Sequence, residues 1–188
     1  EVIIFMFLDL QESTSIAEQL GHIRYSKLIQ DCFSDLGVVL ESQAEIYQYV
    51  GDEAVLIWKH RDGVHHQQCL EAFYRFKQAL ISREAYYRQQ YNCLPFFKAG
   101  VHGGLVTVTE VGRYKKEIAY HGDAVNTAAR IQGQCNAFGE ELLTSAELAA
   151  SLEGGPYSFR PLGQVPLKGK KQAVEICAVS LDKASVSA

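Results

Sequence analysis

The 188-residue chain is predicted to fold as an α+β domain. Short apolar runs bounded by turn residues are typical of strands, whereas longer stretches with apolar residues three and four apart are typical of helices. In chain order these elements read β-α-α-β-β-α-β-β-α-β-α-β-β. Without its additions this order is βαββαβ, a ferredoxin-like core with helices over one face of the sheet and extra C-terminal strands. Residues 1–182 are predicted to form this domain, and the Ala/Ser-rich residues 183–188 a disordered tail.

The N-terminal half is predicted to hold three strands and three helices. Ser13-Thr14-Ser15, followed by Glu18, is a predicted helix start with capping potential, and apolar stripes define the second and third helices. A Gly-Asp-Glu turn at 51–53 joins the second and third strands as a hairpin. The predicted strands are 2–8, 45–50 and 54–59; the first helix begins at Ser13, and the others cover 23–40 and 62–91.

The C-terminal half begins with a glycine-interrupted strand over 96–108, which predicts a bulge or a close approach of another backbone. Residues 113–120 are its predicted hairpin partner. Ser145 is predicted to cap a brief helix that follows a short strand. The remaining predicted elements are a helix over 124–135 and strands over 141–144, 157–162 and 173–179.

Composition limits the classes of function. With 47% hydrophobic and 21% charged residues, the chain is typical of a soluble globular domain. Its net charge of -4 argues against a nucleic-acid partner, and no apolar run reaches the roughly 18 residues that span a bilayer. Five scattered cysteines without CxxC spacing predict reduced thiols and a cytoplasmic location. Because the chain starts at Glu1, we expect a domain of a longer parent, whose sensor or membrane region would lie upstream.

Two carboxylates stand at the ends of predicted strands, Asp9 after the first and Asp52 in the hairpin turn. A buried carboxylate is costly unless it is paired, so two of them suggest a divalent metal with oxygen ligands; capping of the two turns is the alternative. Residues 10–14 form a strand-to-helix loop whose backbone N–H groups could receive phosphates. Asn126 and Arg130 are four residues apart and share a helix face, where they are either functional or ordinary helix-surface residues.

Five motifs in order resemble the catalytic domain of class III nucleotidyl (adenylyl/guanylyl) cyclases. They cover nearly the whole chain to about Val179, and together they are far more specific than any one alone. The motifs are FLDLQEST at 7–14, VGDE at 50–53, KAGVHGG at 98–104, HGDAVNTAAR at 121–130 and LKGK at 167–170.

The resemblance implies the class III cyclase fold and a homodimer with two active sites at its interface. Asp9 and Asp52 of one subunit, with the Leu10 carbonyl, would hold two Mg²⁺ or Mn²⁺ ions. Asn126 and Arg130 of the other subunit would be catalytic, orienting the ribose and stabilising the transferring phosphoryl group. The triphosphate would meet Lys168 and the loop formed by Gln11, Glu12, Ser13 and Thr14. A nucleoside triphosphate would then become a 3′,5′-cyclic nucleotide and pyrophosphate, an adenylate cyclase reaction if the substrate is ATP.

The positions expected to read the base depart from the family. Gln48 stands where members usually have Lys or Glu, and Ala119, followed by Tyr120, stands where adenylyl members often have Asp or Thr. A glutamine amide can donate and accept, so it does not by itself choose a base. ATP is the expected substrate, with GTP or a pyrimidine nucleotide as alternatives. Glu12 also replaces a glycine of the family's phosphate loop.

Two other functions compete with an active cyclase. A silent nucleotide-binding or dimerisation module would need neither the two aspartates nor the Asn126/Arg130 pair. A diguanylate-cyclase relative would carry a Gly-Gly-Asp/Glu-Glu-Phe turn, whereas this chain has VGDEA at 50–54. His102, a lone histidine on a strand, is predicted to be structural.

Overall fold

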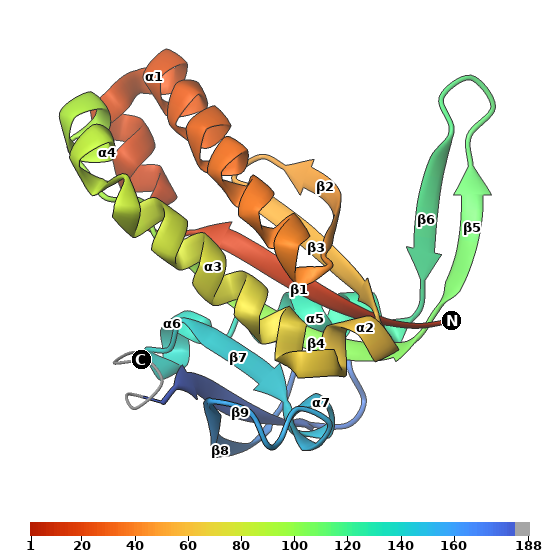
Figure 1. Ribbon diagram of the computed structural model, residues 1–188. Coiled ribbons are helices and arrows are strands. Elements are labelled where there is room, and N and C mark those ends of the chain that lie inside the picture. The colour runs from red at the N-terminus through yellow and green to blue at the C-terminus, as the bar shows by residue number, and fades with distance from the viewer. Residues whose placement is uncertain (183–188) are drawn as a thin grey trace.

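The computed structural model describes residues 1–182; the predicted tail at 183–188 lies outside the described residues. A seven-stranded sheet has the order β2-β3-β1-β4-β7-β9-β8, and β5 and β6 form a separate two-stranded ribbon (Figure 1). The strands are β1 (Val2–Leu10), β2 (Glu45–Val50), β3 (Glu53–Lys59), β4 (Phe97–Leu105), β5 (Thr107–Val111), β6 (Glu117–His121), β7 (Leu142–Ser145), β8 (Tyr157–Val165) and β9 (Val174–Leu181).

The α-helices are α1 (Ser13–Asp35), α2 (His60–Val64), α3 (Gln68–Ser82), α4 (Glu84–Tyr91), α5 (Asp123–Gln132), α6 (Cys135–Phe138) and α7 (Ala146–Ala150). Two 3₁₀ helices, η1 (Leu36–Ser42) and η2 (His65–Gln67), complete the described elements. Strands β2-β3-β1-β4, with helices between β1 and β2 and between β3 and β4, have the order of a βαββαβ unit. The predicted ferredoxin-like core with extra C-terminal strands is confirmed.

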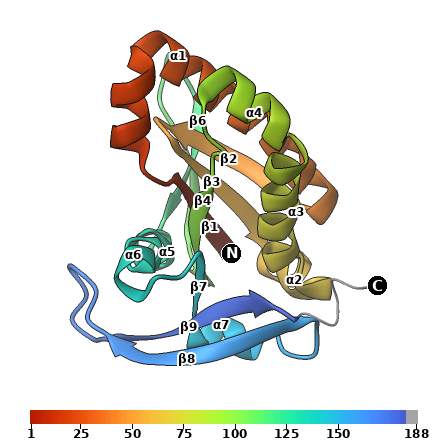
Figure 2. The same ribbon diagram turned by 90° about the vertical axis from the view of Figure 1, so that its left-hand side faces the viewer.

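The sheet buries both of its faces. On one face, Ile4, Met6 and Leu8 of β1 pack with residues of α1 and α3 such as Leu28 and Phe73. On the other, a smaller cluster joins alternate residues of β1 to Ala124 and Ala128 of α5. Figures 1 and 2 show α1, α3 and α4 on one side of the sheet and α5 on the opposite side. The two helices of the βαββαβ core thus cover one face, as predicted, and the additional helix α5 covers part of the other.

The glycines of β4 permit this second packing. The pairing of β4 with β1 runs without a register shift, so the interrupted pattern reflects close approach rather than a bulge. A Cβ built on Gly100 would lie 2.2 Å from the Gln132 backbone nitrogen and 2.9 Å from the Ala128 carbonyl oxygen. One built on Gly104 would lie 2.9 Å from the Ala124 Cβ. Glycine in β4 therefore lets α5 lie directly on the strand.

Several predicted boundaries were wrong because tertiary contacts override local pattern. The single helix at 62–91 is divided at His66 and Gln67, which have left-handed backbone angles, and again near Arg83, which pairs with Asp35 of α1. The strand at 96–108 ends at Leu105, and β5 instead pairs with β6 in the ribbon. Val106, between them, is buried.

The other corrections are small. Ser13 does not cap α1, since Glu12 holds the N-cap position in a left-handed conformation without a side-chain cap bond. Gly21, with φ 78°, kinks α1 between its two predicted helical parts. The predicted cap at Ser145 is confirmed, because its hydroxyl accepts from the Leu148 N–H at 3.2 Å. All five cysteines are free. No helix within residues 1–182 combines the length and apolar character needed to cross a bilayer.

Candidate active site

The two predicted metal-binding aspartates meet at one end of the sheet. Asp9 lies at the end of β1 opposite Glu53, the first residue of β3. Asp52 directly precedes Glu53 in the hairpin turn. The Leu10 N–H donates to the Asp52 carbonyl oxygen at 3.3 Å, which ties the end of β1 to the hairpin turn. Antiparallel pairing of β1 with β3 thus brings together carboxylates 43 positions apart in sequence.

Placing these carboxylates close together is electrostatically unfavourable. Burial, and next the negative charge of Asp52, raise the pKa of Asp9 to about 6. Burial and the charges of Asp9 and Asp52 also raise the pKa of Glu53. Crowded carboxylates favour either a shared proton or a cation. A divalent cation would relieve this repulsion directly.

Tyr25 of α1 belongs to the same cluster, although the sequence indicated only an apolar helix position for it. Its hydroxyl donates to Asp52 Oδ2 at 2.8 Å. Burial and this hydrogen bond raise the pKa of the phenol, so Tyr25 remains a donor. The bond fixes one oxygen of Asp52 and leaves the other free for a ligand.

The donor set fits a hard divalent cation in part. Asp9 and Asp52 offer carboxylate oxygens, and the Leu10 carbonyl could add a third. No group of three or more His, Cys, Asp or Glu side chains in the described part of the chain is arranged as a metal site. Mg²⁺ is commonly held by one or two carboxylates together with substrate phosphates and water. Asp9, Asp52 and the Leu10 carbonyl would thus fill only part of the coordination shell of such a cation.

The loop after β1 borders an open pocket of about 460 Å³. The pocket is lined by Asp9 and Leu10, by Gln11–Ser15, which includes Glu12, Ser13 and Thr14, and by Asn136. The Gln11 N–H donates to the Phe96 carbonyl oxygen at 3.0 Å, and its buried side-chain amide donates to the Asp9 carbonyl oxygen at 3.1 Å. Of the predicted phosphate-binding N–H groups, those of Leu10 and Gln11 are therefore occupied within the protein. The N–H groups of Glu12, Ser13 and Thr14 stand at the start of α1, where a helix can bind an anion.

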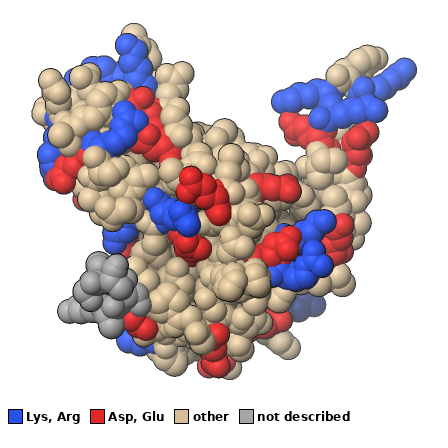
Figure 3. Space-filling view, in the orientation of Figure 1, with Lys and Arg blue, Asp and Glu red and all other residues tan. Residues whose placement is uncertain are grey.

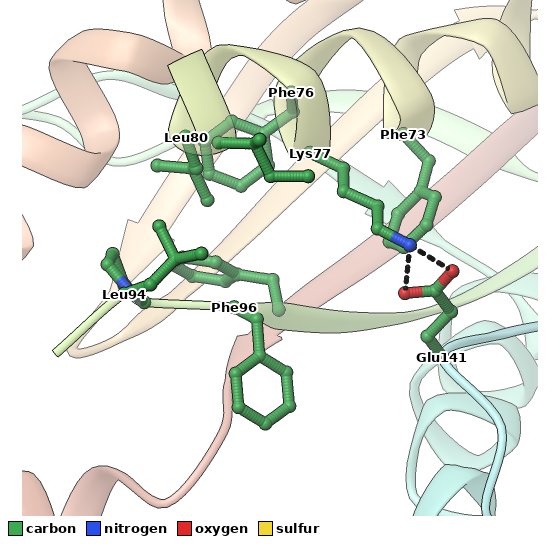
Figure 4. A pocket seen from close by; sticks show the side chains of 10 residues that line it. Phe73, Phe76, Lys77, Leu80, Leu94, Phe96 and Glu141 are labelled. Carbon is green, nitrogen blue, oxygen red and sulfur yellow. Dashed lines mark hydrogen bonds and ion pairs between the residues drawn. The ribbon is translucent and has the colours of Figure 1, made fainter. Parts of the chain in front are cut away.

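A small apolar pocket lies beside the segment that contains Phe96. It has a volume of about 110 Å³ and lies between α3 and the segment 94–97. Figure 4 shows Phe76 and Leu80 of α3 facing Leu94, the Phe96 side chain pointing away from α3, and the Lys77–Glu141 ion pair near Phe73. The two Lys77 Nζ to Glu141 carboxylate distances are 2.7 and 2.9 Å. The segment that lines this pocket includes Phe96, whose carbonyl oxygen accepts from the Gln11 N–H.

Of the residues expected to read the base, Tyr120 contacts Tyr47 of β2, whereas Gln48 and Ala119 lie on separate strands. Gln48 is exposed on β2, beside a register shift that leaves Tyr47 outside the regular pairing. Ala119 and Tyr120 lie on β6, and the Tyr120 ring meets Tyr47 edge-on with centroids 5.0 Å apart. The ring of Phe5 from β1 lies 5.7 Å from Tyr120 on the same side. The sequence did not indicate this aromatic cluster, because its members come from three strands.

Asn126 and Arg130 lie on α5, on the opposite face of the sheet from α1. Asn126 is exposed and Arg130 half-buried, and neither lines the pocket beside Asp9. Within the single chain, the Asn/Arg pair therefore does not border the pocket beside the carboxylate pair. Lys168 is exposed, whereas Lys170 is bonded to α5.

His102 has a buried structural partner, as the sequence predicted. Its Nδ1 lies 2.7 Å from the Ser145 hydroxyl oxygen, between β4 and the cap of α7. Burial lowers the pKa of this imidazole below its ordinary value.

The stabilisation that depends on a neutral His102 should consequently be lost in mild acid, whereas the raised pKa values of Asp9 and Glu53 act in the opposite direction. The unfolded chain takes up a proton at His102 near its ordinary pKa of about 6.5, whereas the native state resists protonation. The contribution of neutral His102 to the free energy of unfolding is complete above about pH 6.5 and is lost as the pH falls below about 6.5. Urea unfolding of wild type and His102→Gln from pH 5 to 8 should show a smaller slope of stability against pH for the variant. Equal slopes would contradict this account.

Comparisons with known proteins agree with the geometry. The family model described as the adenylate and guanylate cyclase catalytic domain matches residues 1–179. Adenylate cyclase 2 of Rhizobium meliloti (strain 1021) is 31% identical over 186 residues, which cover 98% of this chain and 51% of the relative. Adenylate cyclase of Anabaena cylindrica is 27% identical over 182 residues, 93% of this chain and 36% of the relative. The chain thus spans about half or less of these relatives' length.

Solved structures share the fold at lower identity. The adenylyl cyclase CyaB from P. aeruginosa superposes with a TM-score of 0.80 at 20% identity, covering 97% of this chain and 95% of that one. The guanylate cyclase domain of RhGC from Catenaria anguillulae, in complex with GTP, gives a TM-score of 0.77 at 16% identity, with 97% and 98% covered. The described elements therefore form the class III cyclase fold, and the chain belongs to the adenylate and guanylate cyclase catalytic-domain family.

Proposed function

We propose that this domain converts a nucleoside triphosphate, with ATP preferred, into a 3′,5′-cyclic nucleotide and pyrophosphate at a site shared by two copies of the chain. The observation that carries the proposal is the half-buried Asp9–Asp52 pair beside the open loop at the start of α1. A silent module would gain nothing from this costly cluster. The preference for ATP rests on the names of the relatives and not on Gln48 or Ala119.

In the proposed reaction, the ribose 3′-oxygen forms a bond to the α-phosphorus while the bond from that phosphorus to the bridging oxygen breaks. The hydroxyl proton leaves to solvent and pyrophosphate departs.

Asp9, Asp52 and the Leu10 carbonyl would hold two Mg²⁺ or Mn²⁺ ions, which when bound lower the pKa of the attacking hydroxyl and neutralise the triphosphate. The free N–H groups at the start of α1 would bind phosphate oxygens, with Lys168 as a further contact. Asn126 would orient the ribose and Arg130 would stabilise charge on the transferring phosphoryl group.

Two observations support a homodimer. The first is the separation of Asn126 and Arg130 from the carboxylates within one protomer. The second is the β5–β6 ribbon, which projects away from the sheet (Figure 1) and exposes Val108, Val111 and Ile118. A two-stranded ribbon alone is marginally stable in water, so a partner that covers it would stabilise it.

Charge on the ribbon is mixed. Figure 3 shows Lys and Arg gathered at its tip, next to acidic side chains. Lys115 and Lys116 form ion pairs there with Glu117 and Glu110 at 2.9 and 3.3 Å. This neutralisation favours a protein surface over nucleic acid as the ribbon's partner.

A cytoplasmic location within a longer parent protein accords with the free thiols and with the length of the relatives.

The activity is tested by incubating the purified domain with Mn²⁺ and ATP, GTP, CTP or UTP separately. Products are identified by mass and retention time. Cyclic AMP should form fastest. Cyclic product only from another nucleotide would overturn the ATP preference, and no cyclic product from any of the four would overturn the enzymatic function.

Arg130→Ala is expected to lower kcat by about 10²–10³-fold, as removal of a single oxyanion donor does. Mixing this variant with Asp52→Asn should restore activity, because each mixed dimer regains one intact composite site. Random pairing makes half of the dimers mixed, so roughly one quarter of wild-type activity is expected for a two-fold interface. Absence of any recovery, in a mixture shown to exchange subunits, would contradict a shared site.

A further inference from the structure

A short turn before β9 packs directly against α5. Leu167 is buried in a cluster with Ile131 of α5 and Ile176 of β9. The Lys170 N–H donates to the Leu167 carbonyl oxygen at 3.1 Å, which closes the turn 167–170. The turn is therefore anchored on the same helix that carries Asn126 and Arg130.

Lys170 bridges two residues in the first turns of α5. Its ammonium group is bonded to Asp123 Oδ2 and lies 3.1 Å from the Thr127 hydroxyl oxygen. The Thr127 hydroxyl also donates to Asp123 Oδ2 at 3.3 Å, so the three groups form a closed network. The side chain of Lys170 is only 18% exposed, whereas that of Asp123 is 67% exposed. Hydrogen bonding to Lys170 lowers the pKa of Asp123, which keeps the carboxylate charged.

Gly169, next to Lys170 in the turn, lies against the Arg130 guanidinium. A Cβ built on Gly169 would be 3.0 Å from Arg130 Nη2 and 3.3 Å from its Cζ. Its φ of +80° also favours glycine. The backbone of the turn thus lies beside the guanidinium, and the other end of the Arg130 side chain is attached to α5.

We propose that the Asp123–Thr127–Lys170 network positions Arg130 for phosphoryl transfer. Lys170 pins the turn to the start of α5, and the pinned turn limits the orientations that the Arg130 side chain can take. All of these contacts lie within one protomer, so Arg130 is oriented before a partner subunit arrives. The proposal rests on the proposed function only for its catalytic consequence, because the orientation itself is a property of the single chain.

The pair is better suited to orientation than to stability. Asp123 is largely exposed, and solvent screening at that partner keeps the contribution of the ion pair to folding small. A misplacement of a catalytic group by about 1 Å, in contrast, can cost on the order of 10²-fold in rate. Lys170, Asp123 and Thr127 are thus positioning residues, distinct from Arg130 itself.

The kinetic test uses Lys170→Met, which keeps the length of the side chain and removes its charge. With Mn²⁺ and ATP, kcat is expected to fall roughly 10- to 100-fold with KM little changed. Lys170→Arg, which can still bridge Asp123, should recover most of the loss. Lys171→Met changes an exposed neighbour and should match wild type. In an Arg130→Ala background, Lys170→Met should cause no further loss.

A second measurement does not depend on activity. The Arg130 Nε–Hε resonance in nuclear magnetic resonance spectra, assigned by its absence in Arg130→Ala, should report a restrained side chain in wild type and Lys171→Met. Its order parameter should fall in Lys170→Met while the backbone amide spectrum is preserved. An unchanged order parameter would overturn the positioning role even if the domain forms no cyclic nucleotide. Reduced order with full turnover would overturn its catalytic consequence.

Discussion

Asp9→Asn and Asp52→Asn are each expected to abolish cyclic nucleotide formation while leaving the domain folded. Either change removes one of the two carboxylates that a divalent metal site at the end of β1 requires. Asparagine keeps the shape of the side chain, and its carbonyl oxygen can still accept the hydrogen bond that Tyr25 donates to position 52. Product formation with Mn²⁺ and with Mg²⁺ is the measurement, alongside the urea midpoint of each variant.

Stability should move in the opposite direction to activity. Burial and mutual repulsion disfavour the charged forms of Asp9 and Glu53, so loss of the Asp52 charge relieves part of that cost. In metal-free buffer, Asp52→Asn should therefore be at least as stable as wild type. Asp62→Asn, which changes an acid on α2 that pairs with Arg61, serves as the control and should remain active. Wild-type turnover by either site variant would show that these carboxylates do not hold an essential metal.

Gly100→Ala is expected to have the largest effect on stability. The added methyl group would stand 2.2 Å from the Gln132 backbone nitrogen and 2.6 Å from its Cα. Neither atom can move by a side-chain rotation, so α5 must shift away from β4. Overpacking usually costs about 1–3 kcal/mol, and a clash with backbone belongs at or above the upper end of that range. Chemical unfolding should show a loss of about 3 kcal/mol or more.

The displaced helix should also lower activity, because α5 carries Asn126 and Arg130. Gly37→Ala is a matched control, since a Cβ on Gly37 of η1 would meet no atom within 4 Å. That control should retain both stability and turnover. If Gly100→Ala unfolds at the wild-type denaturant midpoint, the close packing of α5 on β4 is refuted.

Much of the fold follows from local pattern. The order of the elements, the hairpin at Gly51, the Ser145 cap and the close approach at the β4 glycines were predicted, and the structure confirms them. Each depends on residues near one another in the chain, such as an apolar run, a turn residue or a missing side chain. The breaks in the 62–91 helix and the end of β4 were missed; near Arg83 the break accompanies an ion pair with Asp35, a partner distant in sequence.

The candidate site likewise combines features that local sequence predicts with features that depend on distant residues. Residue types and spacing indicated which chemical groups the site offers: two strand-end carboxylates, a loop at a helix start, and an Asn/Arg pair on one helix face. How these groups combine became visible in the folded chain alone. Strand pairing set Asp52 beside Asp9, packing of α1 brought the Tyr25 hydroxyl to Asp52, and the turn at Gly169 came to lie against Arg130. The physical reason is that composition and spacing fix chemical type and local conformation, whereas charge coupling, hydrogen-bond partners and orientation arise between residues that only folding brings into contact.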